Sequence, residues 1–205
     1  LAVHANVVVV NLPAHGLNLT SASKVTLNDY VKTVSDAIKE QKGKVTLVAH
    51  SMAGIVASQV ANNMADRIEK VVYVAAYLPK NGEDLLTLSK KDAQSKVGGA
   101  LEFSQDYTEA KIKKDMIVPA VCADCPDFMK DVLVKYHKAE PAKPLGEKVS
   151  LGAKFNTVPK YYISTTNDNA VGYDLQKAMI AANGGIKKVI EMNTSHLPFV
   201  AKPEE

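Results

Sequence analysis

The chain has 205 residues, of which 46% are hydrophobic and 23% charged, a composition typical of one soluble globular domain with a sizeable core. Its formal net charge is only +3, and its lysines are spread along the chain beside a single arginine, Arg67, so no nucleic-acid surface is expected. No apolar run is long enough to span a membrane, so no membrane partner is expected either.

The first part of the chain alternates strand and helix patterns. Residues 6–11 (NVVVVN) are a β-branched run typical of a parallel strand covered on both faces, and the turn sequence LPAHG follows at 12–16. An amphipathic helix is predicted from Thr26, with Gly43 as its stop signal, and a further strand is predicted at 70–76. Strands and helices at these spacings predict right-handed crossovers and a parallel sheet.

Ser51 lies where a predicted strand turns sharply into a predicted helix. The apolar run 45–48 leads into AHSMAG at 49–54, and a helical pattern begins directly after it. A nucleophile held on such a turn needs small residues two positions before and after it, and Ala49 and Ala53 meet that requirement. The alternative is a tight turn whose serine caps the helix, so the chain must also supply a base and an acid.

The regular alternation stops between residues 79 and 158, in a segment rich in lysine, polar residues and proline. Three helical patches are predicted within it, near 84–92, 109–116 and 127–136. The segment is too long for a connection, so we expect a helical insertion that covers the site as a cap. Residues 1–78 and 159–205 would then form the core domain.

Cys122 and Cys125 lie in this insertion with C-x-x-C spacing, which suits a metal pair or a redox couple. The chain has no second pair, and His137 is the nearest histidine, so a zinc site is disfavoured. We expect ordinary cap or loop cysteines, no metal and no other cofactor. Whether the two cysteines pair is not decided by the sequence.

Strand and helix patterns resume after the insertion. A strand, a helix and a strand are predicted, in this order, at Lys160–Thr165, 173–182 and 187–192. Asp168 follows the first strand and His196 the second, so both lie just past the carboxyl ends of strands, as Ser51 does. Active sites collect at that edge of a parallel sheet, and Ser, Asp, His is the order that this architecture uses. We therefore predict a catalytic triad of Ser51, Asp168 and His196.

Each partner of Ser51 also has a purely structural interpretation. Asp168 could be a turn aspartate bonded to its own backbone, and His196 an ordinary loop histidine. Asp174 is the alternative acid, although a helical side chain is less well placed to reach the base. His50 is expected to pack beside the nucleophile. Two further histidines have no partner pattern: His4 and His137.

Six motifs cover most of the chain: LPAHG at 12–16, AHSMAG at 49–54, VVYVAAYLP at 71–79, ADCP at 123–126, TTNDNAV at 165–171 and TSHLPF at 194–199. With them the chain resembles the α/β-hydrolase superfamily, and within it the small esterases related to plant methyl esterases and hydroxynitrile lyases. The resemblance implies an α/β-hydrolase fold, with a mainly parallel sheet, helices on both faces and a helical cap. It also implies a serine hydrolase.

The chain departs from the family pattern at three places. Hydroxynitrile lyases place a lysine just after the catalytic histidine, whereas Leu197 follows His196 here, so lyase chemistry is disfavoured. Family members carry further strands and a His-Gly loop before the LPAHG strand, and a helix after the histidine loop. We therefore expect a part of a longer protein, in which N-terminal strands, one oxyanion donor and a C-terminal helix lie outside this chain. The donor inside it would be the backbone N–H of Met52.

These patterns predict a serine esterase that cleaves a small, mainly apolar carboxylic ester through an acyl-enzyme. Substrate would be bound beside Met52 by His50, Tyr77, Leu78 and Leu197. The alternative is a ligand receptor that keeps the fold and triad with little turnover. A homodimer stays open, as does the compartment, cytoplasmic or exported.

Overall fold

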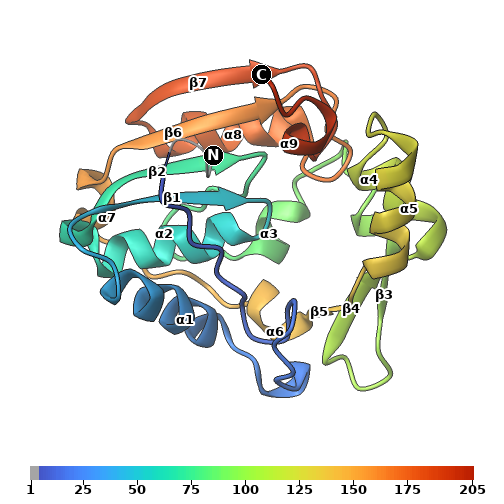
Figure 1. Cartoon of the computed structure of the whole chain (residues 1–205), viewed down its shortest axis with the longest axis horizontal. Helices are drawn as coiled ribbons and strands as arrows, with labels where there is room; N and C mark the ends of the chain where they lie inside the picture. The colour runs from blue at the N-terminus through green and yellow to red at the C-terminus, as the bar shows by residue number, and fades with distance from the viewer. Residues whose placement is uncertain (1–4) are drawn as a thin grey trace.

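Four parallel strands form the main sheet of the computed structural model, which describes residues 5–205. In spatial order they are β1 (Val45–His50), β2 (Ile68–Val74), β6 (Lys160–Thr165) and β7 (Ile186–Met192). All four arrows in Figure 1 point the same way, so their carboxyl ends share one edge of the sheet. The predicted parallel sheet is therefore confirmed. His4, for which the sequence shows no partner pattern, lies outside the described residues.

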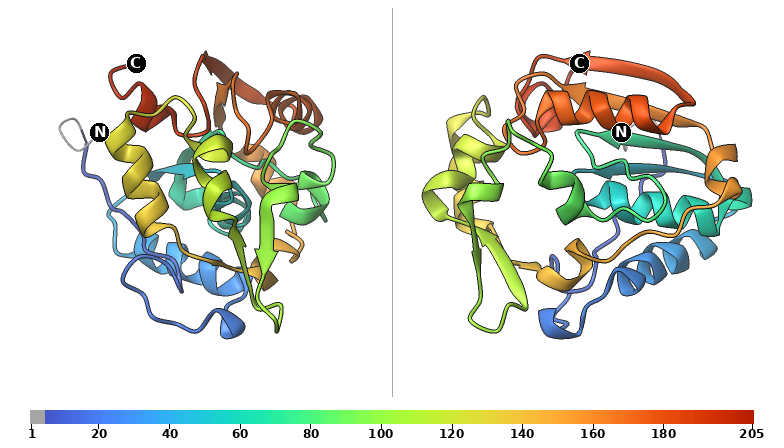
Figure 2. Two further views of the ribbon diagram at one scale, coloured as in Figure 1. Left: turned by 90° about the vertical axis from the view of Figure 1, so that its right-hand side faces the viewer. Right: turned by 180° about the vertical axis from the view of Figure 1, so that it is seen from behind.

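The larger helices gather on one face of this sheet. Helices α2 (Ala53–Asn63) and α8 (Tyr173–Asn183) lie behind the strands in Figure 1 and in front of them in the reversed view of Figure 2, and α1 (Leu27–Lys39) lies beside α2. A reciprocal capping box between Thr26 and Asp29 starts α1 as predicted, and the helix ends at Lys39, ahead of Gly43. Buried residues of these helices and of the strands form the main hydrophobic core.

The opposite face of the sheet is crossed by an irregular N-terminal segment rather than packed with helices, as both views of the N-terminal region show (Figures 1 and 2). Val48 of β1 is 57% exposed there. Within residues 5–205, the expected helices are thus present on one face only. The predicted strand at 6–11 is wrong: these residues are irregular, and Val9 is 80% exposed. A β-branched run becomes a strand only beside a backbone that pairs with it, and no described strand does so here.

Residues 79–158 connect β2 to β6, and their middle part lies beyond the carboxyl ends of the main strands (Figure 1). Five short helices lie in this insertion: α3 (Leu85–Ser89), α4 (Ile117–Val121), α5 (Asp127–Tyr136), α6 (Ala142–Leu145) and α7 (Ala153–Thr157). A small antiparallel sheet joins them, with the order β3 (Leu101–Phe103), β4 (Glu109–Ile112) and β5 (Glu140–Pro141). The insertion is therefore partly β-structured rather than wholly helical.

The helix predicted at 127–136 is confirmed with the same bounds, whereas the one predicted at 109–116 is wrong. That stretch forms β4 and a 3-10 turn because β3 pairs with it across a hairpin, and this tertiary pairing overrides a weak helical pattern. Other short helical turns lie at Ala22–Lys24, Ala65–Arg67, Gly98–Ala100, Lys114–Met116 and, as α9, Pro198–Ala201. None of the helices within residues 5–205 combines the length and apolar character that crossing a membrane requires.

Candidate active site

Ser51 lies on the sharp turn between β1 and α2, with a backbone φ of +54°. Residues with a side chain seldom adopt this left-handed conformation, which persists only where surrounding contacts impose it. Those contacts are present. The Ser51 N–H donates to the carbonyl of Val74 at 3.3 Å, and the Ser51 carbonyl accepts from the N–H of Tyr77 at 3.1 Å. The turn is thus anchored to the end of β2, and it presents the serine at the carboxyl edge of the sheet.

Small residues around Ser51 allow α2 to approach the end of β2. Ala49 is 2% exposed, and a Cβ added to Gly54 would lie 2.1 Å from the carbonyl oxygen of Tyr77. The N–H of Met52, at the start of α2, donates to no acceptor within the described residues. A free N–H at a helix N-terminus suits a negatively charged oxygen, because the helix dipole also favours negative charge there.

Asp168 and His196 meet at the same edge, in the loops that follow β6 and β7. The His196 Nδ1 donates to Asp168 Oδ2 at 2.8 Å, and both side chains are almost fully buried. Thr165 Oγ1 also donates to Asp168, at 2.7 Å, and the N–H groups of Ala170 and Val171 bind its other oxygen. Burial raises the pKa of Asp168, but the charge of His196 and these hydrogen bonds outweigh burial and hold the pKa below its usual value. Asp168 is therefore a carboxylate that orients the imidazole.

Ser51 follows β1 and His196 follows β7, the two outer strands of the sheet, and the His50 side chain links their loops. No hydrogen bond joins Ser51 Oγ to the His196 ring among the described residues, a bond that is often long in sites without substrate. Because Nδ1 binds Asp168, Nε2 is the ring nitrogen left for the serine. The alternative acid, Asp174, is 68% exposed on α8 and pairs with Lys177 at 2.8 Å, so its side chain points away from the base.

Gln176 is a site residue that sequence reasoning missed. Its side chain is fully buried in α8. The amide nitrogen donates to the carbonyl of Val171 at 2.7 Å and lies 3.3 Å from Asp168 Oδ2, while the amide oxygen accepts from the N–H of Thr165 at 3.1 Å. Gln176 thus ties together the loop that presents Asp168. A glutamine between the apolar positions Leu175 and Met179 was the only signal of this role.

The His50 side chain contacts the loop that carries the candidate base, and its packing against Ser51 itself stays a prediction. Its Nε2 donates to the carbonyl of His196 at 2.9 Å, and the two ring centroids are 4.4 Å apart. The Phe199 ring also contacts the His50 ring, edge-on and with the centroids 5.1 Å apart. Burial, followed by the charge of His196, lowers the pKa of His50 to about 3, so His50 is neutral at ordinary pH. Its role as a substrate-binding residue stays a prediction.

The apolar side chains predicted to bind substrate are all buried. Tyr77 is 6% exposed, and Leu78 lies in the main core, where its N–H contacts the sulfur of Met179. Leu197 packs against Cys122 and Cys125. The predicted apolar pocket around them stays a prediction.

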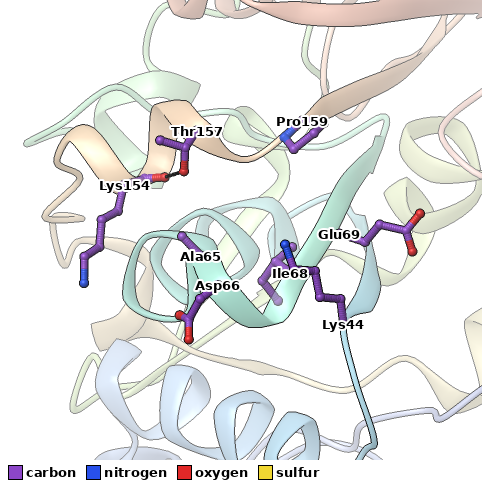
Figure 3. Close-up of a pocket in the computed structure, with 8 residues that line it drawn as sticks. All are labelled: Lys44, Ala65, Asp66, Ile68, Glu69, Lys154, Thr157 and Pro159. Carbon is purple, nitrogen blue, oxygen red and sulfur yellow. Dashed lines mark hydrogen bonds between the residues drawn. The ribbon is translucent and has the colours of Figure 1, made fainter.

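Two depressions of the surface have other linings. A polar one of about 440 Å³ lies beside Asp168, with Asp124 and Tyr173 among its walls. The other, of about 730 Å³, lies at the amino ends of the strands, far from Ser51, and Lys44 and Glu69 are among the residues that line it (Figure 3). Neither is lined by Met52 or by the residues predicted to bind substrate.

Cys122 and Cys125 form a disulfide in the turn between α4 and α5, with their Cα atoms 5.2 Å apart. The sequence had left their pairing undecided, and the disulfide decides it. Among residues 5–205, no group of three or more His, Cys, Asp or Glu side chains is arranged to hold a metal ion.

Comparisons with known proteins agree with this fold. A family model described as "Alpha/beta hydrolase family" matches residues 1–205. "Putative methylesterase 11, chloroplastic" from Arabidopsis thaliana is 27% identical over 97% of this chain, which spans only 54% of that relative's length. "Methylesterase 7" from the same plant is 28% identical over 98% of this chain and 82% of its own.

Solved structures at lower identity share the fold. A tomato methylketone synthase I variant complexed with beta-ketoheptanoate superposes with a TM-score of 0.85 and 19% identity, over 99% of this chain and 84% of its own. A methylesterase from Arabidopsis superposes with a TM-score of 0.79, also at 19% identity, over 94% of this chain and 79% of its own.

Proposed function

Because the chain belongs to the alpha/beta hydrolase family, we propose that it hydrolyses a small, mainly apolar carboxylic ester through an acyl-enzyme on Ser51. The observation that carries the proposal is the hydrogen-bonded pair of Asp168 and His196, at 2.8 Å, on the same sheet edge as a serine with a left-handed backbone. A serine on a strained turn, a buried histidine and a buried carboxylate are the parts that acyl transfer needs.

In the proposed first step, His196 Nε2 takes the hydroxyl proton of Ser51 while Oγ attacks the ester carbonyl carbon. Asp168 holds the ring in the tautomer that leaves Nε2 free and stabilises the imidazolium that forms. The carbonyl oxygen becomes an oxyanion and accepts a hydrogen bond from the N–H of Met52. The tetrahedral intermediate then breaks its bond to the alcohol oxygen, which takes the proton from His196.

In the second step, water replaces the alcohol. His196 takes a proton from the water, whose oxygen attacks the acyl carbon and forms a second tetrahedral intermediate. Its collapse breaks the bond to Ser51 Oγ, which recovers its proton from His196, and the carboxylic acid leaves.

The substrate class rests on the surroundings of the site and on the names of the relatives. Three apolar or aromatic residues lie near the site. Met52 directly follows Ser51, Leu197 directly follows His196, and Tyr77 comes shortly after the end of β2. Apolar linings favour uncharged ligands. Since the named relatives are methylesterases, we propose methyl esters of small apolar acids as the first substrates to assay. The insertion, residues 79–158, would act as the cap over this site.

A fluorophosphonate probe and short p-nitrophenyl esters test the proposal. The probe should label Ser51 in the purified protein, and Ser51→Ala should abolish both labelling and hydrolysis. His196→Ala should lower kcat by roughly 10⁶-fold, because the nucleophile then lacks its base. Ser150→Ala is the matched control, since Ser150 is exposed and only its backbone, not its hydroxyl, is hydrogen-bonded to described residues; it should hydrolyse esters as the wild type does.

The same assay separates an esterase from a ligand receptor. A protein that binds an ester, as measured by calorimetry, but neither reacts with the probe nor releases p-nitrophenol would be a receptor, and the esterase proposal would fail. Labelling at a serine other than Ser51 would overturn the assignment of the nucleophile.

A further inference from the structure

One carboxylate of the insertion, that of Asp124, binds the loop that carries the candidate base, His196. Asp124 lies in the turn between α4 and α5, and its Oδ2 accepts the backbone N–H of Ser195 at 2.7 Å. Its other oxygen, Oδ1, accepts the Ser195 hydroxyl. Ser195 directly precedes His196 and is 2% exposed. The two donors of Ser195 therefore meet the two oxygens of a single side chain that lies 71 residues away.

The same turn also contacts the residue on the other side of the base. Cys122 and Cys125 bracket Asp124 and are joined by a disulfide, which closes the turn. Both cysteines are buried and pack against Leu197, which directly follows His196. The turn 122–125 thus holds the histidine loop by a polar contact before His196 and by an apolar contact after it.

We propose that Asp124 is a positioning residue for His196, by which the insertion sets the place of the catalytic base; this inference rests on the proposed function. Asp168 orients the imidazole ring and His50 binds the carbonyl of His196. Neither contact fixes the backbone on the amino side of His196. Asp124 binds Ser195, the residue directly before His196, while one position further back the Thr194 carbonyl accepts from the Asn167 N–H at 3.1 Å. Removal of the Asp124 carboxylate therefore frees the residue next to His196 and lets the imidazole shift relative to Ser51.

A comparison with the nearby Asp127 shows that binding to Ser195 is specific to Asp124 and is not shared by other aspartates close to the turn. Asp127, three residues further on, has a 96% exposed side chain and pairs only with Lys130, at 2.9 Å. Asp124 borders solvent, yet both of its oxygens turn to Ser195. A carboxylate offers two acceptors to two donors, whereas an asparagine offers one acceptor and one donor.

The test compares Asp124→Ala, Asp124→Asn and the matched control Asp127→Asn. Each variant is assayed for kcat and KM on a short p-nitrophenyl ester, for the rate of fluorophosphonate labelling at Ser51, and for thermal unfolding. Asp124→Ala should lower kcat and the labelling rate together by roughly ten- to hundredfold, with KM changed by less than about twofold, because misplacing a catalytic group by about 1 Å has effects of this size. Asp127→Asn should match the wild type.

Partial variants distinguish positioning from a general loss of stability. Asp124→Asn should keep the bond to the Ser195 N–H and recover part of kcat, and Ser195→Ala, which removes only the hydroxyl, should also lie between the wild type and Asp124→Ala. If Asp124→Ala does not fold, the kcat values of Asp124→Asn and Ser195→Ala decide whether Asp124 positions His196. Folded Asp124 variants with kcat and labelling rates within about twofold of the wild type would overturn the inference.

A spectroscopic readout keeps this inference separate from the proposed function. The Nδ1–H proton of His196, hydrogen-bonded to Asp168, should give a low-field NMR signal that broadens or shifts in Asp124→Ala and not in Asp127→Asn. A wild-type protein without esterase activity would defeat the proposed function, and a signal unchanged by Asp124→Ala would defeat the positioning role.

Discussion

Replacing Gly54 by alanine tests whether the turn at Ser51 depends on close contact between α2 and the end of β2. A Cβ at this position would lie 2.1 Å from the carbonyl oxygen of Tyr77 and 3.1 Å from the Cβ of Ala76. That backbone cannot retreat easily. The Tyr77 N–H donates to Ser51 at 3.1 Å, and the Tyr162 hydroxyl donates to the Ala76 carbonyl at 2.6 Å.

The size of the effect follows from this geometry. Real Cβ atoms essentially never approach another atom within 3.0 Å, so α2 and Tyr77 must separate by about 0.9 Å. Overpacking of this kind costs about 1–3 kcal/mol, and here we expect the upper end, because the obstacle is backbone rather than a flexible side chain. For a domain of this size, about 3 kcal/mol lowers Tm by roughly 6–12 °C. The same shift moves Met52 and Ser51, so kcat should fall by at least about tenfold.

Urea unfolding followed by circular dichroism and hydrolysis of a p-nitrophenyl ester measure both effects. Gly98→Ala is the matched control, because nothing lies within 4 Å of its added Cβ and its φ is outside the left-handed region. It should be neutral or stabilise the protein by up to about 1 kcal/mol. If Gly54→Ala unfolds within about 0.5 kcal/mol of the wild type and hydrolyses the ester as fast, the reasoning about close approach at this turn is refuted.

Three further measurements test the surroundings of the site. Gln176→Leu should lower the free energy of unfolding by about 2–4 kcal/mol, because it leaves buried partners such as the Thr165 N–H unpaired; a urea midpoint equal to that of the wild type would contradict this. Stability should fall by up to about 1.4 kcal/mol per pH unit below pH 6.5, because unfolded chains then protonate His50, whereas the native pKa is about 3. His50→Gln should lose this component of the pH dependence, and an unchanged slope between neutral pH and about pH 4.5 would count against it. Reducing the disulfide between Cys122 and Cys125 should lower the free energy of unfolding by about 2 kcal/mol, according to the loop-closure model. Dithiothreitol should therefore lower the Tm of the wild type and leave the Tm of Cys122→Ser, which has no disulfide to reduce, unchanged.

Local patterns were sufficient for most of the elements around the candidate site. The strand Lys160–Thr165 and the helix at 127–136 have the predicted bounds. The placement of Ser51, Asp168 and His196 directly after strands was also sufficient to bring them to one edge, because parallel strands end on the same side of a sheet.

Local patterns failed where an element depends on a neighbour. The β-branched run at 6–11 has no paired strand among the described residues and is irregular, while 109–116 becomes a strand and a turn because β3 pairs with it. Strand formation is a property of two backbones, so a single segment cannot determine it.

The sequence by itself determined the strands and helices on either side of Ser51, and it predicted Asp168 and His196 as partners of this serine, because each of these positions is marked by the residues beside it along the chain. Only the tertiary structure decided that Gln176 holds the loop of Asp168 and that Asp124 binds Ser195. It also decided that His50 faces the histidine loop. Such contacts join residues far apart in sequence, and they exist only once the whole sheet and the insertion have packed, so no local pattern reports them.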